Sequence, residues 1–187
     1  MKTLLVRTEG GRLVAQGGAD SAVLRPGEPV FVPEEVDEWV SVVAPAVRIS
    51  RLGFHIKASF ARQYYSEVGA VHLLLPRDEA LLGVPMLFHD RCIAPGEWHG
   101  VDAVQEAPFV VTVEDRMGNE LLKKERSLKM SDLRADEILQ FLSGHMTMKT
   151  GDMLVFGDEA IELGSPVPDT KVRAAIFGSL SLDIKIK

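Results

Sequence analysis

Short apolar runs separated by turn residues predict a chain built mainly of β-strands. Residues 4–6 and 13–15 are apolar and flank Gly10-Gly11, and glycine readily adopts the positive φ of a tight hairpin. The longest β-branched run covers residues 39–50. Pro45 within it indicates an edge position or a bulge, because proline has no N–H for a strand ladder. Further strands are predicted at residues 30–32, 70–75, 109–114, 120–122, 152–156, 172–177 and 180–186.

Three segments carry helical signals. Residues 58–68 repeat apolar side chains at the spacing of one helix face, and Gly69 follows as a stop signal. Residues 76–83 predict a short helix with proline in its first turn. Residues 136–142 predict another, with carboxylates at its positive end. Residues 85–100 are expected to be irregular. We therefore expect one α+β, β-rich domain over residues 1–187.

Composition narrows the class of protein. The chain has 187 residues, 46% of them hydrophobic and 26% charged, which is typical of a globular domain that needs no disulfide or metal for stability. Its formal net charge of −6 disfavours a nucleic-acid partner. A single cysteine, Cys92, excludes an internal disulfide framework. No apolar run has the length of a membrane span or signal peptide, so we expect a cytoplasmic protein without a membrane partner.

Few residues on their own indicate a catalytic or metal-binding role. No phosphate-binding glycine loop occurs. His89-Asp90, with Glu97 and His99, could hold a divalent ion, but no two histidines have the spacing that directs both rings to one point, so a polar surface loop is favoured. His72 on a predicted strand is better explained as a half-buried, hydrogen-bonded histidine than as a catalytic group. Cys92 is likewise better explained as a structural thiol than as a nucleophile.

A longer pattern resembles a known family. Residues 136–143 (DEILQFLS) and 146–154 (MTMKTGDML) are similar to the C-terminal pattern of the fumarylacetoacetate hydrolase family, in which a helix ending in serine leads into T-L-x-x-G-D-L/I and a strand. Weaker similarities follow in the same order upstream, at residues 20–33, 48–53, 60–70 and Arg77-Asp78. The resemblance implies a mixed β-roll like the family's C-terminal domain, in a truncated bacterial member that forms a homodimer.

The resemblance also implies a chemistry. Family enzymes hold Mg²⁺, Mn²⁺ or Ca²⁺ by an E-x-E pair on one strand and by aspartates elsewhere, and they act on 2-oxo acids and acylpyruvates. The cation polarises a carbonyl and stabilises an enolate. Counting back from residues 48–53 puts the E-x-E positions at Val42 and Ala44. Counting back from Arg77-Asp78 puts the metal aspartate at Leu73, or at His72 if the register slips by one.

Other elements of the family's chemistry are also absent from the sequence. The G-T-P-x-G turn is replaced by Phe156-Gly157-Asp158-Glu159-Ala160, and the K-G-F-D-x-S-A stretch is unrecognisable near residues 85–95. The N-terminal segment that carries the family's water-activating His and Glu has no counterpart. A predicted β-hairpin, residues 1–19, stands in place of this lid.

These replacements favour a catalytically inactive protein without metal or cofactor, with a structural, regulatory or ligand-binding role. The alternative is an active Mg²⁺- or Mn²⁺-dependent hydrolase, decarboxylase or isomerase with a rebuilt site drawn from His72, His89, Asp90, Glu97 and His99. Arg77 could bind a small carboxylate ligand through its guanidinium fork, although a structural pairing with Asp78 or a helix end is favoured.

Overall fold

Two β-sheets form most of the molecule. The structure, a computed structural model, describes residues 1–34, 39–77, 87 and 89–187. The larger sheet has the order β2 (Arg12–Gly18), β1 (Thr3–Glu9), β9 (Met153–Phe156), β3 (Trp39–Ile49), β4 (Tyr65–Pro76) and β5 (Ile93–Pro95). Two short strands extend this sheet. β10 (Ile161–Gly164) pairs with β3, and β6 (His99–Gly100) pairs with β4.

The smaller sheet is antiparallel and packs against β4. Its order is β12 (Ser179–Lys185), β11 (Lys171–Ile176), β7 (Phe109–Glu114) and β8 (Glu120–Arg126). Ser181 of β12 ties it to the larger sheet. The Ser181 hydroxyl accepts a hydrogen bond from the Ala70 N–H at 2.7 Å and donates one to the Glu97 carbonyl at 2.7 Å.

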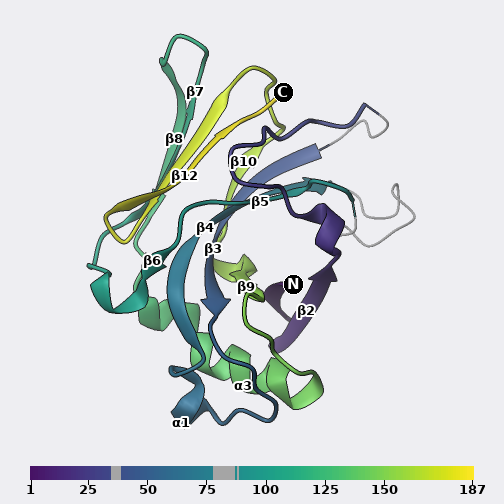
Figure 1. Ribbon diagram of the computed structural model, residues 1–187. Helices are drawn as coiled ribbons and strands as arrows, with labels where there is room; N and C mark the ends of the chain where they lie inside the picture. Colours follow the sequence, from purple (N-terminus) through teal and green to yellow (C-terminus); the bar gives the residue numbers. More distant parts are fainter. Residues whose placement is uncertain (35–38, 78–86, 88) are drawn as a thin grey trace.

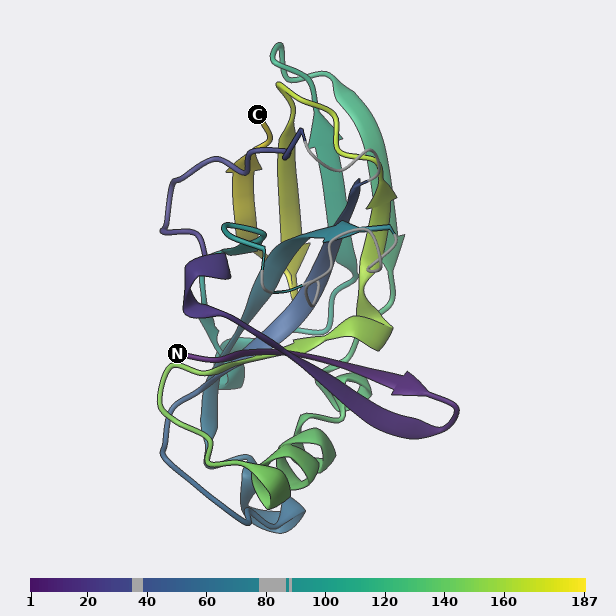
Figure 2. The ribbon, with the colours of Figure 1, turned by 90° about the vertical axis from the view of Figure 1, so that its right-hand side faces the viewer.

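Helices close the end of the molecule opposite the β7–β8 turn, where α1 (Ala58–Ala61) and α3 (Ala135–His145) pack together (Figure 1). Short 3₁₀ helices lie in the connections, among them η1 (Asp20–Ala22), η3 (Val101–Ala103), η4 (Met130–Leu133) and η5 (Gly157–Glu159). The β1–β2 hairpin extends away from this body (Figure 2). In the described part of the chain, no helix is long and apolar enough to cross a membrane.

The helix predicted over residues 58–68 is wrong beyond its first turn. It ends at Ala61, and β4 already begins at Tyr65. Pairing with the whole length of β3 outweighs the local helical spacing. Gly69 is therefore no helix stop; it lies within β4, where a Cβ would come within 2.8 Å of the Glu97 carbonyl oxygen.

Pro45 lies in a central strand, so the predicted edge position is wrong. On one side of β3, β4 pairs along its length, opposite Ala70 at this point. On the other side, β10 pairs with residues 41–43 and β9 with residues 46–48. Pro45 falls in the gap between these two partners, where no N–H is required.

Most other strand predictions are confirmed. The first hairpin turns at Gly10 and Gly11, both at positive φ, and the second is formed by β7 and β8. The helix predicted at residues 136–142 is α3, which continues to His145. Residues 85–100 are less irregular than expected, because they contain β5 and β6. The helix predicted at residues 76–83 lies mostly outside the described residues; Pro76 itself ends β4.

The motif that carries the family resemblance has structural roles. Ser143, within α3, is fully buried, and its hydroxyl oxygen accepts a hydrogen bond from the Ile56 N–H at 2.9 Å. Asp152, also fully buried, accepts hydrogen bonds from the Lys2 and Lys149 N–H groups, each at 2.8 Å, and pairs with the Lys2 ammonium at 2.7 Å. Gly151 precedes it at φ +90°, which favours glycine. Asp152 thus anchors the start of β1 beside β9, while Ser143 holds the segment before α1 against α3.

Candidate functional site

A pocket of about 390 Å³ lies on one face of the larger sheet, bordered by β1, β3, β4, η5 and β10. Its apolar lining residues are Leu5, Val40, Val42, Leu73, Leu75, Pro76 and Ala160, and its polar or small ones are Arg7, Arg77, Glu162 and Gly157. Strand alternation places Val40, Val42 and Ala44 on this face of β3. The floor is therefore made of apolar side chains from the two longest strands.

The positions that the resemblance assigns to metal ligands lie on this face. Val42 is directly opposite Leu73 in the β3–β4 pair and opposite Glu162 in the β3–β10 pair, so these three side chains share one face. Val42 and Leu73 both line the pocket, whereas Ala44 lies further along β3 and is fully buried opposite Val71. The geometry thus gathers two of the three positions at one cavity.

His72 lies on the other face of β4, so the alternative register would direct the metal position away from the pocket. It is fully buried rather than half-buried, and its Nε2 lies 2.7 Å from the Ser41 hydroxyl oxygen. Burial lowers the pKa of His72 from 6.5 to about 3, because the charged ring would lose its hydration. The imidazole is neutral at physiological pH, and its Nδ1 has no hydrogen-bond partner among the residues that the structure describes.

The pocket does not fit a divalent cation. Val42, Ala44 and Leu73 offer no oxygen atom, and a hard cation needs several oxygen ligands to replace its hydration shell. Glu162 is the one carboxylate among the described lining residues. Within the described ranges, no group of three or more His, Cys, Asp or Glu side chains could hold a metal ion.

Two guanidinium groups give the pocket positive charge. Arg7 donates a hydrogen bond to the Gln16 side-chain oxygen at 2.9 Å and lies 3.8 Å from the Glu9 carboxylate. Arg77, at the end of β4, is exposed. Gly157 allows Arg7 to lie against the backbone, because a Cβ there would come within 2.4 Å of the Arg7 Cγ. Two arginines above an apolar floor can bind a carboxylate with an apolar body.

Hydrogen bonds to β1 and β8 fix the η5 wall of the pocket. Asp158 accepts a hydrogen bond from the Thr8 N–H at 2.9 Å. Arg126 of β8 donates to the Asp158 carbonyl at 3.1 Å and forms an ion pair with Glu159 at 2.8 Å. The segment that the resemblance places at the family's G-T-P-x-G turn is therefore held in the pocket wall by hydrogen bonds and an ion pair.

The residues of the rebuilt-site alternative lie in different surroundings. The His89 ring contacts Trp39, with centroids 5.0 Å apart, while Asp90 is exposed. His99 Nε2 lies 3.1 Å from the Leu180 carbonyl oxygen, and the Glu97 backbone binds Ser181. None of them lines the pocket floored by Val42 and Leu73.

Cys92 is fully buried, in keeping with a structural thiol. Desolvation raises its pKa to about 12, so the nucleophilic thiolate is disfavoured.

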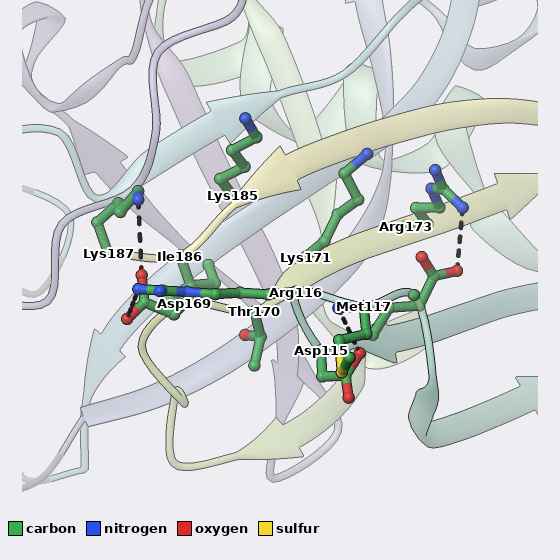
Figure 3. A pocket seen from close by; sticks show the side chains of 12 residues that line it. Asp115, Arg116, Met117, Asp169, Thr170, Lys171, Arg173, Lys185, Ile186 and Lys187 are labelled. Carbon is green, nitrogen blue, oxygen red and sulfur yellow. Dashed lines mark hydrogen bonds and ion pairs between the residues drawn. The ribbon is translucent and has the colours of Figure 1, made fainter.

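A second pocket, of about 490 Å³, is bordered by β11, β12 and the β7–β8 turn (Figure 3). Its basic side chains are Arg116, Lys171, Arg173, Lys185 and Lys187. Carboxylates neutralise much of this charge. Asp169 pairs with Arg116 and, at 3.5 Å, with Lys187, while Glu114 pairs with Arg173 at 3.0 Å. The pocket is a mixed ion-pair network and lacks a concentrated excess of positive charge.

Sequence reasoning identified Arg77 and the apolar positions of the floor but missed Arg7 and Glu162. Arg7 follows the apolar run of β1, and Glu162 lies between two apolar residues of β10, so each reads as an ordinary solvent-facing side chain. Their role depends on which strands are neighbours. For the η5 wall of the pocket, the signal in the sequence was the alignment of residues 156–160 with the family's G-T-P-x-G motif.

Comparisons with known proteins support the fold. No family model and no curated protein matches the chain. Among solved structures, it is similar to 2-hydroxyhepta-2,4-diene-1,7-dioate isomerase from Mycobacterium marinum, with 20% identity and a TM-score of 0.77 over 99% of this chain and 73% of that one. It is also similar to fumarylpyruvate hydrolase from Pseudomonas aeruginosa, in complex with Mn²⁺ and pyruvate, with 14% identity and a TM-score of 0.72 over 100% and 90%.

A third similar structure is that of a protein from Yersinia pestis CO92 assigned to the fumarylacetoacetate hydrolase family, with 14% identity and a TM-score of 0.78 over 100% of this chain and 92% of that one. Identities this low carry information on architecture alone. The predicted fold class is confirmed: the chain has the β-rich fold of fumarylacetoacetate hydrolase family proteins.

Proposed function

We propose that this chain is a degenerate member of the fumarylacetoacetate hydrolase family that has lost catalysis and binds a small organic carboxylate in the pocket between β1, β3 and β4. The observation that carries the proposal is the apolar pair Val42–Leu73 on the pocket floor, at the positions where the family resemblance puts metal-ligating carboxylates. The protein acts as a cytoplasmic homodimer without metal or cofactor.

The loss of catalysis follows from the chemistry of the floor. Enolate formation from a 2-oxo acid places negative charge on substrate oxygens, and in the family a cation stabilises that charge. An apolar floor supplies neither a cation nor hydrogen-bond donors at this point, so the developing charge would be buried without compensation. His72 cannot replace these groups because it lies on the opposite face of the sheet.

The remaining groups suit binding. Arg7 and Arg77 can hold a carboxylate, and Leu5, Val40 and Leu75 can cover an apolar body. Glu162 on the neighbouring strand repels a second carboxylate placed above Val42. A monocarboxylate with a short hydrocarbon chain therefore fits better than a dicarboxylate.

Calorimetric titration with hexanoate tests binding, with hexanol as the uncharged control. We expect hexanoate to bind and hexanol to bind at least tenfold more weakly. Arg7→Ala and Arg77→Ala should each weaken hexanoate binding about tenfold, the loss of one charge-assisted interaction. Arg51→Ala, at an exposed arginine outside the pocket, is the matched control and should leave binding unchanged. Equal affinity for hexanoate and hexanol would exclude the carboxylate site.

Thermal unfolding of chelator-treated protein tests the loss of the metal. Any ligand that binds the native state raises the midpoint. We expect no rise with millimolar Mg²⁺ or Mn²⁺, alone or with oxalate, which mimics an enolate. A metal-dependent rise strengthened by oxalate, or metal-dependent turnover of an acylpyruvate, would contradict the inactive assignment and favour the rebuilt active site.

A further inference from the structure

A small cavity of about 210 Å³ is lined by both sheets, on the face of β3 opposite the carboxylate pocket. Its apolar lining residues are Val113, Leu121, Leu122, Leu163, Pro166, Val167, Val172 and Ile186, and its polar ones are Ser41, Ser165 and Thr170. Leu121 and Val167 are more than half exposed, so the cavity opens to solvent between apolar side chains. No charged side chain is among the described lining residues.

Ser41 is the polar residue whose hydrogen bonding determines which ligands suit this cavity. It is 2% exposed, and its hydroxyl lies 2.7 Å from the Nε2 of His72. Thr170, the other buried polar residue, already donates to the Val167 carbonyl at 2.6 Å. Ser165 is exposed and can bind water. The direction of the Ser41–His72 hydrogen bond therefore decides whether the Ser41 hydroxyl proton is available to a ligand in the cavity.

The Nδ1 atom of His72, which has no partner in the described part of the chain, indicates the direction of this hydrogen bond. A neutral imidazole carries one proton, and the tautomer follows from the hydrogen bonds that each nitrogen makes. A proton on Nδ1 would leave a buried N–H donor unpaired, whereas a proton on Nε2 leaves only an unpaired acceptor, which proteins tolerate better. We therefore assign the proton to Nε2, which then donates to Ser41. The hydroxyl proton of Ser41 then has no acceptor among the described residues.

We propose that this cavity is a second binding site, for a small, uncharged, mostly apolar molecule that presents one hydrogen-bond acceptor, such as a ketone or ester carbonyl, to the Ser41 hydroxyl. The size is adequate, because a cavity of about 150 Å³ suffices for benzene. A carboxylate is disfavoured because the cavity has no cation to pair with it. The proposal is independent of the carboxylate pocket, which uses the other face of β3.

Acetophenone and ethylbenzene are matched probes, since they share a ring and differ mainly in the carbonyl oxygen. Methyl resonances of Val113, Leu163 and Val172 should shift on titration with either probe. We expect acetophenone to bind about fivefold more tightly, the effect of one neutral hydrogen bond. Ser41→Ala should remove this preference, and Leu121→Asp at the exposed rim should weaken both probes. Equal affinities in the unmodified protein, or shifts confined to Val42 and Leu73, would overturn the proposal.

Nitrogen-15 NMR of the histidine rings gives a test that needs no variant. We expect the His72 spectrum to show the proton on Nε2 at neutral pH. A proton on Nδ1 would mean that Ser41 already donates to His72 and has nothing to offer a ligand. Hexanoate titration reports on the other face of the sheet, so failure of the carboxylate site would leave this result unaffected.

Discussion

Val42 of β3 lies directly opposite Leu73 of β4, and both side chains line the carboxylate pocket. Side chains at directly opposed positions of an antiparallel pair are close enough to share a ligand. The backbone therefore still brings together two positions that suit a chelate, although the residues there cannot form one. Substitutions at this pair can therefore test metal binding while the backbone geometry is kept.

Restoring carboxylates should restore metal binding. We expect Val42→Glu, Ala44→Glu and Leu73→Asp in combination to destabilise the metal-free protein by several kcal/mol, because buried charges are introduced. Mn²⁺ should then raise its unfolding midpoint by several degrees, while the unmodified protein shows no response. A variant that keeps Ala44→Glu but has Val40→Glu and Leu75→Asp, at the neighbouring opposed pair of the same face, is the control. Equal responses of the two variants would show that the register assigned to the site is wrong.

Removing the Ser143 hydroxyl should destabilise the fold without affecting the pocket. Ser143→Ala leaves the buried Ile56 N–H without its acceptor, at a cost of about 1–3 kcal/mol in the free energy of unfolding. Urea unfolding measures this change. Ser131→Ala, at an exposed serine in η4, should change stability by less than about 0.5 kcal/mol. Unchanged stability in Ser143→Ala would show that this motif residue has no structural role.

Cys92 should label only when the protein unfolds. The thiol is fully buried and its pKa is raised to about 12, so we expect no reaction with a maleimide at pH 7 in native buffer. Labelling should appear along the urea unfolding curve with the same midpoint as circular dichroism. Rapid native labelling would mean that the β4–β5 region opens locally.

The buried His72 should make the protein acid-sensitive. Its pKa is about 3 in the folded state and 6.5 when solvated, so between these values the unfolded state binds a proton that the folded state does not. Stability is thus full above pH 6.5 and falls as the pH decreases toward 3. Between pH 7 and 4.5 we expect a contribution of about 2–3 kcal/mol from this residue.

Urea unfolding at the two pH values measures the acid effect. His72→Gln keeps a neutral hydrogen-bonding group beside Ser41, and the free energy of unfolding should fall less in this variant than in the unmodified protein. His99→Gln, at a partly exposed histidine, should behave as the unmodified protein does. The same pH dependence in all three proteins would exclude His72 as its source.

Enlarging Gly157 should disturb the carboxylate pocket through Arg7. In Gly157→Ala the new methyl group would collide with the Arg7 side chain, and the guanidinium must move. We expect hexanoate affinity to fall severalfold, with less than about 1 kcal/mol lost in stability if only Arg7 moves. Gly144→Ala, where a Cβ meets open space, is the control. Unaltered affinity would mean that Arg7 does not contact the ligand.

Local patterns predicted elements well where the local conformation decides the structure. Gly10-Gly11 indicated its hairpin because positive φ is a property of the residue, and α3 followed from its apolar spacing. Tyr65 was misassigned because β3, which pairs with it, is distant in sequence. Counting from motifs placed Val42 and Leu73 together, yet Arg7 and the Ser41–His72 pair became visible only with the strand order. Sequence patterns do not reveal which strands adjoin.

The gap at Pro45 has a consequence for how such a protein can change over generations. β9 and β10 run in the same direction along one side of β3, and η5 lies between them in sequence, so Gly157 of η5 borders the pocket. A pocket that is framed by paired strands keeps that frame when a floor residue is exchanged for another of similar size. Substitution of the floor residues can then remove one chemistry and favour another ligand in the same space, while the strand pairing that frames the pocket is kept.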